Sequence, residues 1–202
     1  ACADCHMPYK STGGVKFTDH HIQSPLNNIS NSCQVCHRET ETTLLNNVYD
    51  RQDKVLELSQ IATRSLVKAH IEAKTAWDNG ANEEQMKPVL ELIRQAQWRW
   101  DFVSASHGGS FHAPLECARI LGNSIERSEK ARVLLSEILT KQNVKLPVQY
   151  PDISTKEKAQ EYIGLDIKKM ADDKKVFLET VVPLWDKQAE ERHDKMNENY
   201  KK

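Results

Sequence analysis

Two elements of the form Cys-x-x-Cys-His, at residues 2–6 and 33–37, constrain this chain more than any other feature of its sequence. The two intervening residues place both sulfurs on one side of a tight helical turn, where they can add to the two vinyl groups of one porphyrin. The adjoining histidine then reaches the iron. The sequence therefore predicts two covalent c-type haems, one held by Cys2, Cys5 and His6 and the other by Cys33, Cys36 and His37.

Zinc and redox thiols are the alternatives for these cysteines. Two Cys-x-x-Cys pairs can build a tetrahedral Cys₄ or Cys₃His zinc site. The sequence favours haem over zinc, because a histidine follows at once in both copies, the loop between them is long, and the flanking residues carry no ribbon-like strand pattern. A pair of disulfides or redox dithiols would give the two histidines no shared role.

The overall charge and hydropathy exclude several partners. The 202 residues carry a formal net charge of -1, which gives no reason to expect nucleic acid or an anionic membrane surface as partner. No apolar run approaches the roughly 18 residues that a membrane span requires. The sequence shows no signal peptide, although c-type haem is normally attached outside the cytoplasm. We therefore expect the C-terminal part of a longer, exported, periplasmic protein.

Long helices are predicted after the second haem motif. Small residues recur every seven positions on a helix expected from about Thr42 to Trp77 and ending at residues 78–80. This stripe allows another helix to approach closely, either the next helix of this chain or the same helix of a second subunit. Its members are Val48, Val55, Ala62, Ala69 and Ala76, with Leu58, Leu66 and Ala73 on the same face.

The rest of the chain continues the helical pattern. A capping box at Asn82 and Gln85 opens a second helix, and Pro114 fits the first position of a third helix that ends near Lys141. Their expected core face consists of Met86, Val89, Leu90, Ile93, Ala96, Trp100, Val103, Leu115, Ala118, Leu121, Ile125, Ala131, Leu135 and Ile138. The aromatic residues Trp98, Trp100 and Phe102 are expected to pack or to border a porphyrin.

A linker at 145–151 and a capping box at Ser154 and Glu157 precede a final helical region, with a kink near Pro183 and a solvated charged tail at 187–202. The predicted fold class is mainly α, a multihaem cytochrome c in which haem-binding loops precede long C-terminal helices. The expected domains are a haem-attachment segment, 1–41, and a helical region, 42–202, that completes the haem pocket.

Further histidines are candidates for a second axial ligand, because imidazole on both faces of a haem suits electron transfer. His20 and His21 are the nearest to the first motif, with a pair of surface histidines as the alternative. His112 lies just before Pro114, where a glycine turn fixes the backbone, and His107 lies on the other side of that turn. His70 is expected to be an ordinary surface or packing histidine, and Cys117 a small buried hydrophobe.

Six segments together make the chain resemble the C-terminal half of the pentahaem cytochrome c nitrite reductases, the ammonia-forming family. The resemblance covers essentially the whole chain. Its segments are CADCHMP at 2–8, TDHHI at 18–22, CQVCH at 33–37, AQWRWD at 96–101, SHGGSFHAP at 106–114 and PDISTKEKAQ at 151–160.

The resemblance implies roles for individual residues. It implies that the first motif holds the fourth haem and the second motif holds the fifth. It also implies that His20 is a distal ligand of a second haem attached upstream, and that His112 is the distal ligand of the fourth haem, with His107 as the fallback. The distal histidine of the fifth haem is implied to lie before this sequence.

The same resemblance implies a function that this sequence carries only in part. The family's active-site haem is attached at a Cys-x-x-Cys-Lys motif, and neither that motif, the nitrite-binding residues nor the calcium ligands occur in this sequence. Two bis-histidine haems would relay electrons for the six-electron reduction of nitrite to ammonium. The implied partners are a second copy of the chain, bound through long helices, and a membrane-bound or soluble multihaem cytochrome as electron donor. A non-catalytic multihaem electron carrier is the alternative.

Overall fold

A computed structural model describes the backbone of residues 2–200 and the side chains of residues 2–197. Contacts within the chain divide it into two compact units, 1–148 and 149–202. This division follows contacts and not function. It therefore does not test the expected boundary between a haem-attachment segment, 1–41, and a helical region, 42–202, which stays a prediction. Among the described residues, no helix combines the length and the apolar character that crossing a membrane requires.

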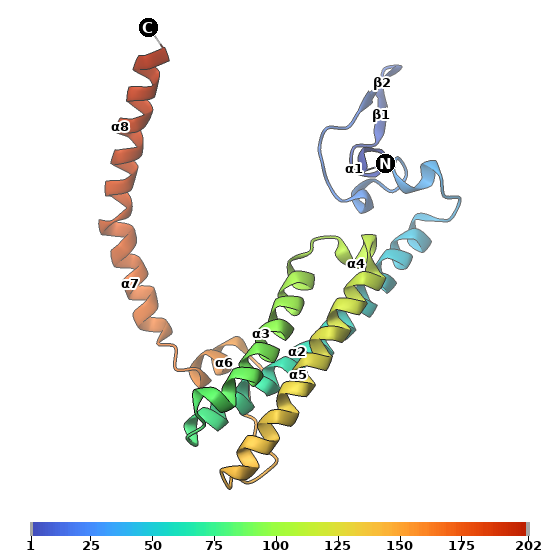
Figure 1. Cartoon of the computed structure of the whole chain (residues 1–202). Coiled ribbons are helices and arrows are strands. Elements are labelled where there is room, and N and C mark those ends of the chain that lie inside the picture. The colour runs from blue at the N-terminus through green and yellow to red at the C-terminus, as the bar shows by residue number, and fades with distance from the viewer. Residues whose placement is uncertain (1, 201–202) are drawn as a thin grey trace. The chain divides into compact units, whose positions relative to one another are not determined.

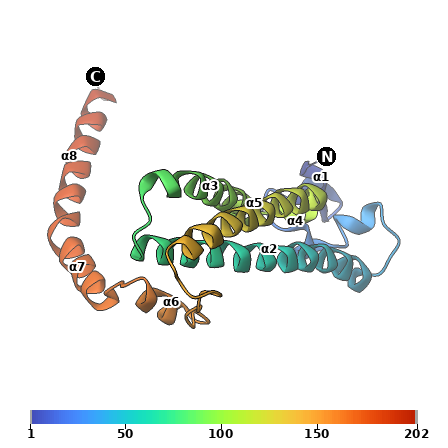
Figure 2. The same cartoon turned by 60° about the horizontal axis from the view of Figure 1, so that its bottom comes forward.

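Three long helices form the body of the first unit (Figures 1 and 2). They are α2 (Glu41–Asp78), α3 (Glu83–Ala105) and α5 (Pro114–Lys141). At a rise of 1.5 Å per residue, the 38 residues of α2 span about 57 Å. The capping box predicted for the start of α3 is present, because the Asn82 side chain accepts from the Gln85 amide while the Gln85 side chain accepts from the Asn82 amide.

The small-residue stripe of α2 is buried inside the chain. Ala62, Ala69 and Ala76 are fully buried where α2 packs against α5 and α3. Val55, Leu66 and Ala73 are also buried, whereas Val48 and Leu58 are half-buried. The sequence left open whether this stripe packs against a helix of the same chain or of a second subunit. In the structure it packs against helices of the same chain.

Two serines occupy core positions that the hydrophobic pattern did not identify. Ser124 and Ser128 of α5 are fully buried. The Ser124 hydroxyl donates to the carbonyl of Ala96 at 2.8 Å, and the Ser128 hydroxyl donates to the carbonyl of Ser124 at 2.9 Å. Because these bonds satisfy the hydroxyls, two small polar residues can lie at the contact between α5 and α3.

Four of the expected packing residues prove to be exposed. Leu90 and Leu115 lie outside the core, with Leu115 86% exposed, and Trp98 and Phe102 are also exposed. At about 100° per residue, Trp98, Phe102 and Leu115 fall on the far side of their helices from the buried residues, which the spacing between neighbouring apolar residues did not reveal. Trp100 does pack against the core, and its indole donates to Thr63 on α2 at 2.8 Å.

A buried ion pair joins α2 to α5. Both oxygens of Glu72, which is only 7% exposed, accept from the Arg132 guanidinium at 3.1 Å. Arg132 also donates to Glu129, whose Oε1 accepts from the Ser65 hydroxyl at 2.6 Å. Burial acts to lower the pKa of Arg132, but its hydrogen bonds to the two carboxylates outweigh that effect and raise the pKa.

Short elements make up the first forty residues. The chain begins with α1 (Cys2–His6), followed by an antiparallel hairpin of β1 (Tyr9–Thr12) and β2 (Val15–Thr18) around a turn at Gly13 and Gly14. Two 3₁₀ turns follow, η1 (Pro25–Asn28) and η2 (Cys33–Val35), and the segment lies near the end of the helical body that carries α4 (Gly109–His112) (Figure 1).

The second unit contains three helices among its described residues, α6 (Lys156–Tyr162), α7 (Ile167–Thr180) and α8 (Val182–Tyr200). The predicted capping box at Ser154 was wrong by one residue, because Thr155 is the N-cap and its hydroxyl accepts from the Lys158 amide.

The predicted kink is a break at Val181, which places Pro183 in the first turn of α8. Residues 187–197 are solvent-exposed as expected, and they belong to α8. Residues 201 and 202 of the predicted tail lie outside the described residues.

Candidate functional site

The first Cys-x-x-Cys-His element forms a single helical turn. Because α1 spans the motif, Cys2 and Cys5 lie three residues apart on one helix face, and both are exposed. His6 is half-buried, and its Nδ1 donates to the carbonyl of Gln23 at 2.9 Å. A carbonyl only accepts, so this bond places the proton on Nδ1 and leaves the Nε2 lone pair available to a metal.

His112 lies close to His6, although the two residues come from distant parts of the chain. It is the last residue of α4, and the centroids of the two imidazoles are 6.1 Å apart with 37° between the ring planes. Two imidazoles on opposite faces of one metalloporphyrin have ring centres roughly 6 Å apart, since each nitrogen lies about 2 Å from the metal and each ring centre about 1 Å further. The spacing therefore fits two axial ligands of one haem.

A cavity of about 540 Å³ contains this pair of histidines, within the ~300–1,000 Å³ typical of cofactor sites. Its wall combines cysteines and histidines with apolar side chains from α2 and the N-terminal loops. The lining residues are Cys5, His6, Ser24, Pro25, Leu26, Cys33, Val48, Gln52, His107, Gly108, Phe111 and His112. The residues present thus fit a haem attached at the first motif.

The second motif is more open. Cys33 opens the 3₁₀ turn η2 and is half-buried, whereas Cys36 and His37 are exposed. The Nδ1 of His37 lies 3.7 Å from a carboxylate oxygen of Glu39. Because Cys33 also lines the cavity of the first motif, the two attachment points lie side by side.

His20 and His21 lie on an exposed turn after β2. The Nδ1 of His20 donates to the carbonyl of Thr18 at 2.8 Å, which leaves its Nε2 available, while the Nδ1 of His21 lies 2.8 Å from a carboxylate oxygen of Asp19. Asp19 is buried and also pairs with Lys10. The hydrogen bond from Lys10, followed by those from His21, holds the pKa of the Asp19 carboxyl well below its usual range.

The remaining candidates fall into two groups. His107 is exposed and lines the same cavity as His112, whereas His70 is exposed on α2, 3.4 Å from the side-chain oxygen of Gln97. Cys117 is confirmed as a buried core residue, and burial, with a smaller effect of Glu116, raises the pKa of its thiol.

The zinc alternative requires the cysteines and histidines to converge on one point. Among residues 2–197, no group of three or more His, Cys, Asp or Glu side chains is arranged to hold a metal ion. The geometry instead pairs one histidine of a motif with one distant histidine, an arrangement that fits a haem with two imidazole ligands.

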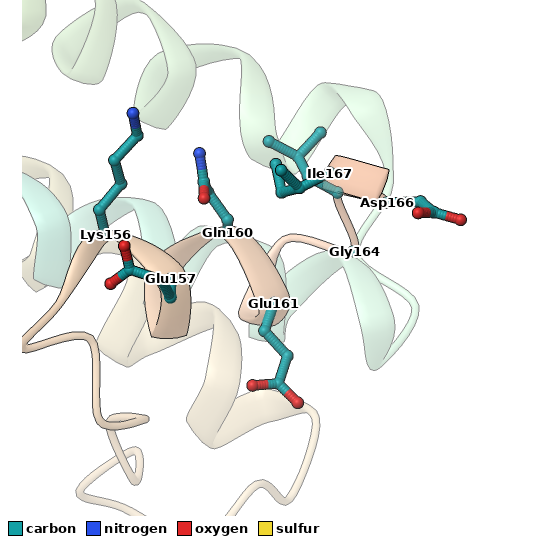
Figure 3. Close-up of a pocket in the computed structure, with 8 residues that line it drawn as sticks. Lys156, Glu157, Gln160, Glu161, Gly164, Asp166 and Ile167 are labelled. Carbon is teal, nitrogen blue, oxygen red and sulfur yellow. The ribbon is translucent and has the colours of Figure 1, made fainter. Parts of the chain in front are cut away.

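A second cavity of about 680 Å³ lies in the unit 149–202, between α6 and the start of α7 (Figure 3). Lys156 and Gln160 point to one side of α6, whereas Glu157 and Glu161 point to the other, as their four-residue spacing requires. Its lining contains no histidine or cysteine. This cavity therefore lacks the residue types that attach a haem.

Three residues that the sequence analysis did not name lie around His112: Phe111 and Gly108 border its ring, and Arg51 contacts Phe111. The Phe111 ring meets the His112 ring edge-on, with centroids 5.4 Å apart, and the Arg51 guanidinium lies over the Phe111 ring, 5.6 Å from its centroid. Gly108 lies against the His112 ring itself. The double glycine before residues 111 and 112 was a usable signal, but nothing in the sequence pointed to Arg51.

A mainly α-helical chain with two Cys-x-x-Cys-His attachment motifs has the architecture of a multihaem cytochrome c. The profile of the Cytochrome c552 family matches residues 1–198, and the chain belongs to this family.

Relatives named cytochrome c-552 support this assignment. The chain is 59% identical over 193 residues to the protein of Parabacteroides distasonis, covering 96% of this chain and 39% of the relative. It is 62% identical over 185 residues to the protein of Bacteroides thetaiotaomicron, covering 92% of this chain and 38% of the relative. The chain thus spans about two fifths of the length of these relatives.

A solved structure shares the fold. It is cytochrome c nitrite reductase from Desulfovibrio desulfuricans, described with two calcium sites in its catalytic subunit. The TM-score is 0.62 and the sequences are 33% identical, over 68% of this chain and 30% of the other.

Proposed function

We propose that the chain is the C-terminal, electron-relaying portion of a periplasmic, ammonia-forming nitrite reductase with five haems. In this proposal it carries two bis-histidine c-type haems, one at each Cys-x-x-Cys-His motif. The catalytic haem, the nitrite-binding residues and the calcium ligands lie outside this sequence. The solved nitrite reductase with the same fold supports the reaction class.

The opposed imidazoles of His6 and His112 carry this proposal. They come from distant parts of the chain, yet their centroids lie 6.1 Å apart beside a cavity that the Cys5 thiol also lines. An iron held between two imidazoles exchanges single electrons and has no coordination position left for a substrate. The site therefore suits electron transfer better than nitrite binding.

Each residue of the site has a defined task in this arrangement. Cys2 and Cys5 supply the thioether sulfurs, and the carbonyl of Gln23 holds the His6 ring in the tautomer that presents Nε2. The presence of Cys33 in the same cavity supports two neighbouring haems in this chain.

Other parts of the proposal concern the whole protein. His20, exposed and held through Nδ1, would serve a haem attached upstream, and a multihaem cytochrome would donate the electrons. A homodimer through long helices would use exposed residues of those helices, such as Leu56 and Ile61 of α2, because the small-residue stripe is buried within the chain.

The proposal is tested in two steps, first by counting the covalent haems and then by measuring the reduction of nitrite. Mass spectrometry of the intact protein is expected to show five covalent haems, and a viologen donor with nitrite is expected to yield ammonium. Five haems without ammonium would replace the reductase by a non-catalytic electron carrier. A colourless protein with unmodified cysteines would favour zinc binding or thiol redox chemistry at the two motifs.

Replacing His112 tests the ligand assignment. His112→Ala is expected to convert one ferric haem from low spin to high spin, because it removes one of that iron's two imidazoles, while the number of covalent haems stays the same. The matched control is His107→Ala, which removes a histidine from the same cavity and is expected to leave the spectrum unchanged. The opposite pair of results would assign the ligand to His107.

A further inference from the structure

Gly108 forms the start of the short helix that carries His112. Its backbone is left-handed, with φ 76° and ψ -2°, a conformation that residues with a Cβ adopt at a cost. The Gly108 carbonyl accepts from the His112 amide at 2.9 Å and from the Phe111 amide at 3.0 Å. The backbone of residue 108 therefore fixes the position from which the His112 ring extends.

Gly108 also leaves room for the ring. A Cβ built on residue 108 would lie 3.2 Å from Cδ2 and 3.6 Å from Nε2 of His112. Carbon atoms pack best at about 3.5–4.0 Å, so the first of these distances would force the imidazole to shift. The same ring is bordered by the Phe111 ring, which Arg51 covers from α2. His112 is an exposed residue, so its imidazole can move in response to a Cβ at residue 108.

We propose that Gly108 is a positioning residue that orients the His112 imidazole opposite His6. This inference rests on the proposed function, because it takes both histidines as axial ligands of one haem. Any side chain at residue 108 changes the 37° angle between the two rings or draws Nε2 away from the iron. Both changes alter the electronic state of that haem without removing its thioether bonds.

The test is Gly108→Ala in the intact protein, followed by haem counting and by absorption and electron paramagnetic resonance spectroscopy of the ferric state. The g values of a low-spin ferric haem depend on the angle between its two imidazole planes. We expect an unchanged haem count, together with a shifted largest g value or a loss of low-spin signal confined to one haem.

Two glycine variants separate the ring contact from other effects. Gly80→Ala imposes the same left-handed strain, at φ 89°, where no atom lies within 4 Å of the added Cβ. Gly109→Ala disturbs the same turn but directs its Cβ to 3.1 Å from the Ser106 Cβ and 3.2 Å from the Cys117 sulfur. Both controls are expected to keep the parental haem spectrum.

The outcomes distinguish a failure of the positioning role of Gly108 from a failure of the proposed function. A parent protein without covalent haem would overturn the proposed function. A parent with low-spin haems and a Gly108→Ala variant with the same spectrum would overturn the positioning role alone, as would a Gly109→Ala variant with the same change. If Gly108→Ala fails to fold, Gly108→Asn is the second variant, since asparagine tolerates the left-handed backbone and still adds a Cβ; it must show the same spectral change.

Discussion

Enlarging Ala69 tests where the small-residue stripe of α2 packs. Ala69 is fully buried within the chain, against neighbouring helices of the same unit. Ala69→Leu adds three carbon atoms at a point without free space, and overpacking of this kind costs about 1–3 kcal/mol. For a unit of this size, each kcal/mol lowers the midpoint of thermal unfolding by roughly 2–4 °C. The midpoint of thermal unfolding is therefore expected to fall by about 2–12 °C.

The assay is thermal unfolding followed by circular dichroism, together with sedimentation of the same samples. Gln60→Leu is the matched control, because it introduces the same leucine side chain at an exposed position of the same helix. A surface change of this kind is expected to stay within about 0.5 kcal/mol of the parent. An Ala69→Leu protein with the parental midpoint but weaker self-association would refute intrachain packing and move the stripe to a subunit interface.

Two further predictions concern stability. Arg132→Met removes the guanidinium from the buried Glu72 carboxylate, and we expect a loss of about 3 kcal/mol in urea unfolding, the lower end for a buried pair because Arg132 is a quarter exposed. Adding Glu72→Gln should recover part of that loss, and no recovery would contradict the ion-pair explanation. Thr155→Ala removes the N-cap of α6 at a cost of about 1 kcal/mol, seen as faster amide exchange over 156–162, whereas a larger effect of Ser154→Ala would reinstate the capping box.

Local signals in the sequence predicted the helical body closely. The expected helix from about Thr42 to Trp77 is observed as Glu41–Asp78, and Pro114 and Lys141 bound α5 as expected. These boundaries were predictable because caps, prolines and glycines act within one turn of the backbone, so neighbouring residues decide them. The same rule missed the start of α6 by one residue, where Ser154 and Thr155 both offered a hydroxyl.

The composition of the core was less predictable. Ser124 and Ser128 are buried because neighbouring backbone carbonyls accept their protons, and Leu115 is exposed although it is a large apolar residue of α5. A hydrophobic pattern records neither the available hydrogen-bond acceptors nor the width of the face that the next helix covers. Both depend on tertiary packing.

The sequence by itself determined the attachment pattern: two thiol pairs, each followed by histidine, have the spacing within five residues that is typical of a c-type haem site. Only the tertiary structure decided that His112 lies opposite His6, that Gly108 makes room for its ring, and that the stripe of α2 faces its own chain. The physical reason is distance along the chain. Spacing fixes what adjacent residues can bind, whereas the packing of α2, α3 and α5 determines which remote residues meet.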